Sequence, residues 1–246
     1  MKKHNLRAVI LVAGRGERLR PLTTSTPKSL LTIGPVAILG NTLQILQSAA
    51  VGSVTLVTGF HSEKIRRFVE ERFPKIRARF HRNTSYSTTN TLYSLMHAKS
   101  AVTGKPFLLL DGDLLFDASV LAPLLSSSPG SILACDSSVL LDDEAVRAIG
   151  DPDGRIRLIG KKIDKRGTGF GESIGLAKIE ARASRRLFQI GPGIIRDGGR
   201  RFYYEAAFQT LIDEGYPFHT VDVRGRKWVE IDTSADLRRA RALFAR

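Results

Sequence analysis

A segment near the N-terminus combines glycines with fixed positive charges in a single loop. It follows the apolar, β-branched run at residues 8–12, which predicts a buried strand. The residues that could do chemistry here are Gly14, Gly16, Arg18 and Lys28. A loop at the carboxyl end of a strand can approach a polyphosphate with its backbone and neutralise it with cations. Glycine permits the close approach because it has no Cβ. An ordinary strand-to-helix turn is the alternative interpretation.

Two carboxylates end a second apolar run, at Asp111 and Asp113. Side chains alternate along an extended chain, so these two can share one face, and Gly112 between them leaves room for a ligand. Paired carboxylates at a strand end suit Mg²⁺, which takes few protein ligands together with phosphate oxygens. A turn that simply terminates the strand is the alternative. Beside the first loop, the sequence favours the metal.

The whole stretch from Leu11 to Lys28 resembles the L-x-A-G-x-G-x-R-L-x-P-L-T-x-x-x-P-K signature of a nucleotidyltransferase superfamily that makes activated sugars and phospho-alcohols. The resemblance implies that a phosphate monoester attacks the α-phosphorus of a nucleoside triphosphate and pyrophosphate leaves. It implies catalytic charge neutralisation by Arg18 and Lys28. The residues that it assigns to the nucleotide are Val12, Ala13, Gly14, Arg15 and Gly16, of which Val12 departs mildly from the usual small residue. No Gly-Lys-Ser/Thr follows, so γ-phosphoryl transfer is disfavoured.

The same resemblance implies a shared metal site. Asp113 matches the direct Mg²⁺ ligand, and residues 227–236 look like the family's closing W-x-E-I-D-T-x-x-D-L segment. Asp232 matches the aspartate that joins Asp113 on the metal. A helix N-cap is the alternative role, and both can hold if Thr233 caps the helix while Asp232 faces the ion. Asp236 is interpreted as a first-turn partner of the helix dipole.

Residues 83–94 distinguish subfamilies. Their N-x-x-Y-x-x-x-N-x-x-Y-S pattern resembles the phosphocholine cytidylyltransferases and their relatives that act on inositol phosphate or aminoethylphosphonate. CTP is therefore the expected nucleotide. The amide of Asn90 could bind a pyrimidine edge, or Asn90 could cap a helix. Asn83 and Asp111 are assigned to the nucleotide as well.

The acceptor site is expected in the second half of the chain. Residues 170–178 resemble the family's G-E-S-x-G segment, and residues 201–208 its W/Y-Y-E-D-A helix. The residues assigned to the acceptor are Lys161, Glu172, Tyr204 and Glu205. Aromatic faces beside carboxylates would suit a cationic head group. Tyr204 could instead fill the core with Phe208. The usual acidic residue after the glutamate is Ala206 here, which leaves the acceptor's identity open.

Short apolar runs alternate with amphipathic stretches, which predicts an α/β fold. The resemblance implies a Rossmann-like three-layer αβα sandwich with a mostly parallel mixed sheet. Predicted strands lie at 7–12, 53–58, 77–81, 106–111, 131–135, 156–160 and 218–223, and a short strand precedes the last helix. Predicted helices lie at 38–50, 61–72, 90–101, 117–126, 181–189, 203–215 and 233–245. Asn41 or Thr42 would cap the first helix, and Thr233 or Ser234 the last.

Two loops are expected, at 126–130 and at 161–172. One domain would span 1–246, with a nucleotide-binding half at about 1–115 and an acceptor-binding half at about 116–246.

Composition narrows the remaining classes. The chain has 246 residues, 42% hydrophobic residues, one cysteine and a formal net charge of +14. Cys135 alone excludes an intramolecular disulfide and disfavours a thiolate zinc site. Arginines are scattered rather than striped between aromatics, so small anionic substrates are favoured over nucleic acid. No segment reads as a signal peptide or a membrane span, so a cytoplasmic protein without stable membrane insertion is expected. A homodimer stays open.

The prediction is a Mg²⁺-dependent nucleotidyltransferase whose partners are two small molecules, a nucleoside triphosphate and a phosphorylated acceptor. The favoured reaction transfers CMP from CTP to phosphocholine, inositol 1-phosphate or 2-aminoethylphosphonate. A hexose-1-phosphate uridylyl- or thymidylyltransferase and a catalytically silent nucleotide-binding module are the alternatives.

Overall fold

The computed structural model describes residues 6–127, 130–139, 143–161, 163 and 169–244. Its first strand, β1 (Arg7–Val12), lies inside the main sheet, paired in parallel with β4 (Ser53–Thr58) and β6 (Phe107–Asp111). Nearly every residue of these three strands is buried. Strands covered on both faces need continuous apolar runs, which explains their composition.

The main sheet is mixed, as predicted. Its strands in spatial order are β5 (Ala78–Arg82), β4, β1, β6, β11 (Gly171–Ile179), β9 (Arg147–Gly150) and β10 (Ile156–Gly160). β8 (Ser131–Asp136) pairs with β11 and with β12 (Phe218–Asp222). β11 runs antiparallel to β6, β8 and β9. By contrast, β5, β4, β1 and β6 are all parallel to one another. It therefore joins the parallel half of the sheet to the rest.

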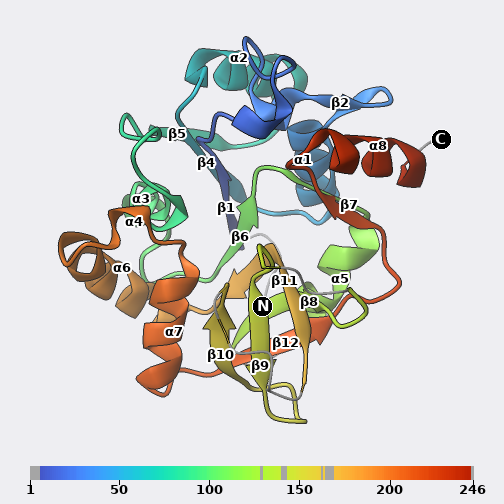
Figure 1. Cartoon of the computed structure of the whole chain (residues 1–246). Helices are drawn as coiled ribbons and strands as arrows, with labels where there is room; N and C mark the ends of the chain where they lie inside the picture. The colour runs from blue at the N-terminus through green and yellow to red at the C-terminus, as the bar shows by residue number, and fades with distance from the viewer. Residues whose placement is uncertain (1–5, 128–129, 140–142, 162, 164–168, 245–246) are drawn as a thin grey trace.

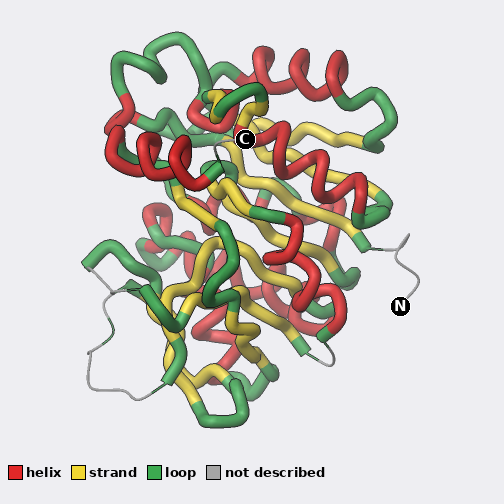
Figure 2. Tube along the Cα trace, turned by 90° about the vertical axis from the view of Figure 1, so that its right-hand side faces the viewer, coloured by secondary structure: helices red, strands yellow, loops and turns green. Residues whose placement is uncertain are grey.

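Helices cover both faces of the sheet, which gives three layers (Figures 1 and 2). On one face of the sheet, a hydrophobic cluster joins the strands to four helices: α3 (Thr91–Met96), α4 (Lys99–Val102), α6 (Ala181–Arg196) and α7 (Glu205–Asp213). On the other face, a second cluster joins the strands to three helices: α1 (Ile38–Ser48), α2 (Ser62–Arg72) and α5 (Ala118–Ser126). Alternate residues of β1 enter the two clusters, Val9 on one side and Ile10 on the other. Among the described residues, no helix has the length and apolarity needed to cross a bilayer.

A small third cluster holds the last helix, α8 (Ser234–Leu243), against the N-terminal loop. Its centre is the antiparallel pair of β7 (Leu114–Phe116) and β13 (Trp228–Glu230). Leu19 from the loop, Leu115, Val229 and Leu237 are all buried there. A further hairpin pairs β2 (Thr32–Ile33) with β3 (Val36–Ala37). Segments from both ends of the chain thus meet beside the end of β6.

The structure differs from the predicted elements at a few points. β11 was predicted only as a pocket segment, because glycines interrupt its apolar pattern. The predicted helix 90–101 is divided into α3 and α4, with His97 and Ala98 between them. α6 continues beyond 189 to Arg196 through Pro192. Positions 128–129, 162, 164–168 and 245, which belong to predicted loops and the last helix, lie outside the described residues.

The caps of the first and last helices turned out differently. Asn41 and Thr42 were wrong as caps, because α1 begins at Ile38 directly after β3. The Asn41 side chain instead donates to the Phe116 carbonyl at 2.8 Å. Thr233 is confirmed as the N-cap of α8, where its hydroxyl accepts from the Asp236 N–H. The Asp236 carboxylate accepts from the Thr233 N–H at 2.8 Å, which completes a capping box.

Replacing Thr233 by alanine removes the hydroxyl side of this capping box, so Thr233→Ala should lower the free energy of unfolding by about 1 kcal/mol. Thr233→Ser keeps the hydroxyl and should retain most of that stability. Urea unfolding followed by circular dichroism compares the two. Equal stability of both variants and the parent would contradict a capping role.

Candidate functional site

The N-terminal glycine loop is shaped by close packing against Lys28. Gly16 has a φ of +65°, a conformation that favours glycine. A Cβ at Gly16 would lie only 2.9 Å from the Cβ of Lys28. The Thr23 hydroxyl donates to the Gly16 carbonyl at 2.7 Å and holds the turn. The glycine therefore lets the lysine stem pass beneath the loop.

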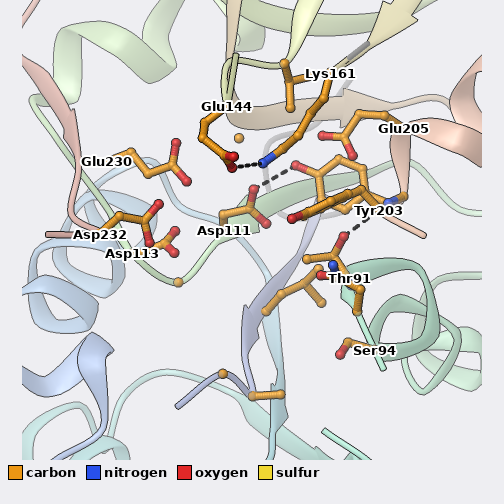
Figure 3. A pocket seen from close by; sticks show the side chains of 18 of the residues that line it. Thr91, Ser94, Asp111, Asp113, Glu144, Lys161, Tyr203, Glu205, Glu230 and Asp232 are labelled. Atoms are coloured by element: carbon orange, nitrogen blue, oxygen red, sulfur yellow. Dashed lines mark hydrogen bonds and ion pairs between the residues drawn. The ribbon is translucent and has the colours of Figure 1, made fainter. Parts of the chain in front are cut away.

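The predicted metal aspartates lie side by side, although 118 positions separate them in the sequence. Asp113 follows β6 and Asp232 follows β13. Pairing of β7 with β13 aligns the two segments, and the Ile231 N–H donates to the Asp113 carbonyl at 3.1 Å. Glu230 joins them, and one carboxylate oxygen from each of these three residues lies within 4.8 Å of the others. Figure 3 shows the three side chains converging at one end of the pocket.

Two cations already contact this acidic cluster of Asp113, Glu230 and Asp232. The Lys28 ammonium lies 2.6 Å from Asp113 Oδ2 and 2.6 Å from Asp232 Oδ1. Arg18 Nη2 lies 2.8 Å from Asp232 Oδ2. Burial lowers the pKa of Lys28, but attraction to the two aspartates outweighs it and holds that pKa above its ordinary value. Lys28 is therefore charged at neutral pH.

The acidic cluster fits a divalent ion. Its donors are all carboxylate oxygens, the ligands that Mg²⁺ prefers. Asp113 Oδ1 is buried without a hydrogen-bond partner, so one ligand atom is already free. Glu230 is largely buried, and burial followed by repulsion from Asp113 raises its pKa to about 8. Such crowding of carboxylates is costly unless a cation offsets it.

Asp111 lies close to the acidic cluster and accepts a hydrogen bond from a tyrosine. The Tyr204 hydroxyl donates to Asp111 Oδ2 at 2.9 Å, while Asp111 Oδ1 is buried without a partner. Burial, and then repulsion from Asp113, raises the pKa of Asp111 well above its ordinary value. Gly175, with φ +74°, lies against it, and a Cβ there would come within 2.6 Å of Oδ2. Tyr204 also packs on Phe208, with ring centroids 5.1 Å apart. It thus serves both the core and the pocket.

Glu205 begins α7 at the opposite end of the pocket (Figure 3). Burial raises its pKa to about 7, and its Oε2 has no hydrogen-bond partner. Nearby, the Lys161 ammonium lies 4.5 Å from the centre of the Tyr203 ring and 3.2 Å from Glu144 Oε2. Tyr203 is 39% exposed and carries the Lys161 ammonium over its ring. At this end of the pocket an aromatic ring and the Glu144 carboxylate together contact the positive charge of Lys161.

Two cavities meet at the acidic cluster. The first, of about 270 Å³, lies between the glycine loop, the start of α3 and the start of α7. The second, of about 610 Å³, lies beside α8 and contains the predicted acceptor residue Glu172. The residues common to both walls are Arg18, Glu144, Lys161, Glu230 and Asp232. The acidic cluster is thus open to both cavities.

The remaining residues predicted to bind the nucleotide line different cavities. Ala13, Gly14 and Asn90 line the first cavity, and Val12 and Gly16 line a smaller one beside Lys28. Asn90 is the N-cap of α3, since its Oδ1 accepts from the Thr91 N–H, so the predicted alternative role holds.

The side chains of Asn83 and Arg15 contact other residues of the protein. The amide of Asn83 is fully buried and donates to the Thr89 and Ser94 hydroxyls, both at 3.1 Å. Arg15 lies over the Tyr86 ring, 5.6 Å from its centre. Asn83 therefore shapes the loop that leads to α3, and it does not line the cavity.

Sequence reasoning did not assign four residues of this site, namely Glu144, Gly175, Tyr203 and Glu230. Glu230 carried a usable signal, because it stands two positions before Asp232 and follows a strand's alternation. Gly175 stood inside a quoted motif without a stated role. Tyr203 was considered as an aromatic face for a cationic head group, but a core role was preferred, and nothing in the sequence distinguished Glu144.

Known proteins resemble this chain along its length. It is 28% identical to the CMP-5'-(3-aminopropyl)phosphonate synthase of Streptomyces rubellomurinus, over 98% of the chain but 39% of that protein. It is 26% identical to the bifunctional IPC transferase and DIPP synthase of Aquifex aeolicus, over 95% of the chain and 50% of that protein. The 2-aminoethylphosphonate cytidylyltransferase of Lancefieldella rimae is 23% identical, over 94% of the chain and 89% of that protein. The chain thus spans half or less of the first two relatives.

Solved structures share the fold. The inositol-1-phosphate CTP transferase from T. maritima superimposes with a TM-score of 0.82 at 22% identity, covering 97% of this chain and 95% of that one. The CTP:phosphocholine cytidylyltransferase from Streptococcus pneumoniae gives 0.77 at 18% identity, covering 97% and 99%. The family description "MobA-like NTP transferase domain" matches residues 8–148. Since that match covers more than half of the chain, the protein belongs to the MobA-like NTP transferase domain family.

Proposed function

We propose that this protein transfers CMP from CTP to a phosphonate or phosphate monoester that carries an amine, and releases pyrophosphate. The observation that carries the proposal is the convergence of Asp113 and Asp232 on Lys28 beside the glycine loop. The printed names of the Streptomyces and Lancefieldella relatives support CTP and an aminoalkylphosphonate. The site would hold Mg²⁺ on Asp113, Asp232 and Glu230, and the bound ion would offset charge on the triphosphate.

The step requires alignment more than covalent chemistry. An oxygen of the acceptor bonds to the α-phosphorus of CTP, the bond from that phosphorus to the bridging oxygen breaks, and its electron pair leaves with pyrophosphate. Lys28 and Arg18 would neutralise the charge that grows on the α-phosphoryl and leaving groups. The attacking phosphonate is anionic at neutral pH, so no general base is required. The first cavity is lined by the glycine loop and also by Tyr203 and Glu205, so it would bring the two substrates together beside the acidic cluster.

The acceptor's amine would lie near Glu205 and Tyr203. Glu205 offers a buried carboxylate oxygen without a partner, and Tyr203 offers an aromatic ring. The Lys161 ammonium that now lies over this ring indicates that a cation is favourable there. An uncharged polyol such as inositol would use these groups less well. We therefore place aminoalkylphosphonates ahead of inositol phosphate and hexose phosphates as acceptors.

Removal of the Lys28 charge should slow the reaction. Lys28→Ala is expected to lower kcat by roughly 100-fold, as loss of one preorganised charge partner does in other enzymes. Pyrophosphate release from CTP and 2-aminoethylphosphonate measures the effect. Lys75→Ala, at an exposed position, is the matched control and should keep full activity. Near-normal turnover of Lys28→Ala would exclude the assigned role.

The acceptor affinity should depend on the ionisation of Glu205. Its pKa of about 7 means that Glu205 is mostly protonated at pH 6 and mostly charged at pH 8. The KM for 2-aminoethylphosphonate should therefore fall as pH rises across this range. Glu205→Gln should remove that trend and raise KM at pH 8 by about tenfold, because an ionic hydrogen bond is lost.

Ethylphosphonate, which lacks the amine, provides the control acceptor. Its KM should be the same for the parent protein and Glu205→Gln at every pH. Parallel pH profiles for the two acceptors in the parent protein would refute contact between Glu205 and the amine.

A further inference from the structure

Lys28, a cation of the protein itself, lies between the two aspartates that would hold a divalent ion, and together with Arg18 it engages both oxygens of Asp232. Lys28 contacts one oxygen of Asp113 and one of Asp232 at the same distance, 2.6 Å. Each of these aspartates also contributes an oxygen to the three-carboxylate arrangement with Glu230. An ammonium and a divalent ion cannot share a position between two carboxylates, because their charges repel and their volumes overlap.

Packing around its side chain fixes Lys28 in this position. Only 14% of its side chain is exposed, and its stem passes against Gly16 in the space that a Cβ would fill. The short helical turn at residues 28–30 fixes its backbone. Contacts at both ends of the side chain therefore favour the bridged arrangement in the free protein.

We propose that Lys28 is the resident counter-ion of the acidic cluster in the free protein and that a divalent metal must displace its ammonium to bind. This inference rests on the metal site of the proposed function. The displaced ammonium needs a new anionic partner, and the phosphates of a bound nucleotide supply one at the adjacent glycine loop. Metal and triphosphate then favour each other's binding, and each should bind weakly alone, since such coupling is reciprocal.

The test measures Mn²⁺ binding to the full chain without nucleotide, by the electron paramagnetic resonance signal of free Mn²⁺. Lys28→Met keeps the apolar stem and removes the charge, so it should bind Mn²⁺ about tenfold more tightly than the parent, within the usual range of such couplings. Lys28→Gln, a second neutral variant, should behave likewise. Lys99→Met, exposed on α4, should match the parent. Equal or weaker Mn²⁺ binding by both Lys28 variants would overturn the proposal.

Thermal unfolding gives an independent readout. Without a counter-ion the carboxylates repel, so Lys28→Met should melt below the parent protein in chelator and recover more than the parent does when Mn²⁺ is added. If Mn²⁺ raised the melting temperature of the parent protein more than that of Lys28→Met, displacement would be contradicted.

Pyrophosphate release separates this inference from the proposed function. A parent protein that releases pyrophosphate, with Lys28 variants that gain no Mn²⁺ affinity, refutes displacement alone. Tighter Mn²⁺ binding by the variants, with no pyrophosphate from any acceptor, refutes the transferase and leaves displacement standing.

Discussion

Charge neutralisation inside the acidic cluster is the interaction on which the site depends. Asp113, Glu230 and Asp232 bring three carboxylates together in a partly buried place, where unbalanced charge is expensive. Lys28 and Arg18 supply the balance from the N-terminal loop. Every other feature of the site follows from this requirement: the glycine that makes room for the lysine stem, and the strand pair that aligns the aspartates.

The fold delivers these groups from opposite ends of the chain to one edge of the sheet. Parallel β1 and β6 end side by side, so the glycine loop and Asp111 emerge together. β11, antiparallel to β6, then brings Gly175 beneath Asp111 and leads to the helices that carry the acceptor side. This is the usual place for a ligand in an open α/β sheet.

The sequence predicted those elements of the structure that depend on local residue patterns. β1, β4 and β6 are continuous apolar runs and were found within one residue. Residue types also predicted an N-cap at Thr233 or Ser234, and the structure selects Thr233. β11 was not found as a strand, because Gly171, Ser173 and Gly175 break the period that marks one. Asn41 was mistaken for a cap because a two-residue strand ends just before α1. Side-chain partners such as Tyr204 with Asp111 depend on tertiary approach, which spacing in the sequence does not encode.

The candidate site divides in the same way. The glycine loop, Lys28, Asp113 and Asp232 stand in dense motifs, and the structure gathers them. Glu144 comes from a segment without a motif, and Tyr203 stands in a motif that fits a core residue equally well, so only the tertiary arrangement shows that both line the pocket.

The pairing of β7 with β13 has a mechanical consequence. The backbone ladder and the Ile231–Asp113 hydrogen bond join the two aspartate-bearing segments directly, as a small sheet outside the main one. The spacing of these two segments is thereby set by main-chain geometry, whereas Lys161, Tyr203 and Glu205, proposed to lie near the acceptor, stand at the end of β10 and the start of α7. A shift of β10 or α7 would therefore leave the backbone spacing between the two aspartate-bearing segments unchanged.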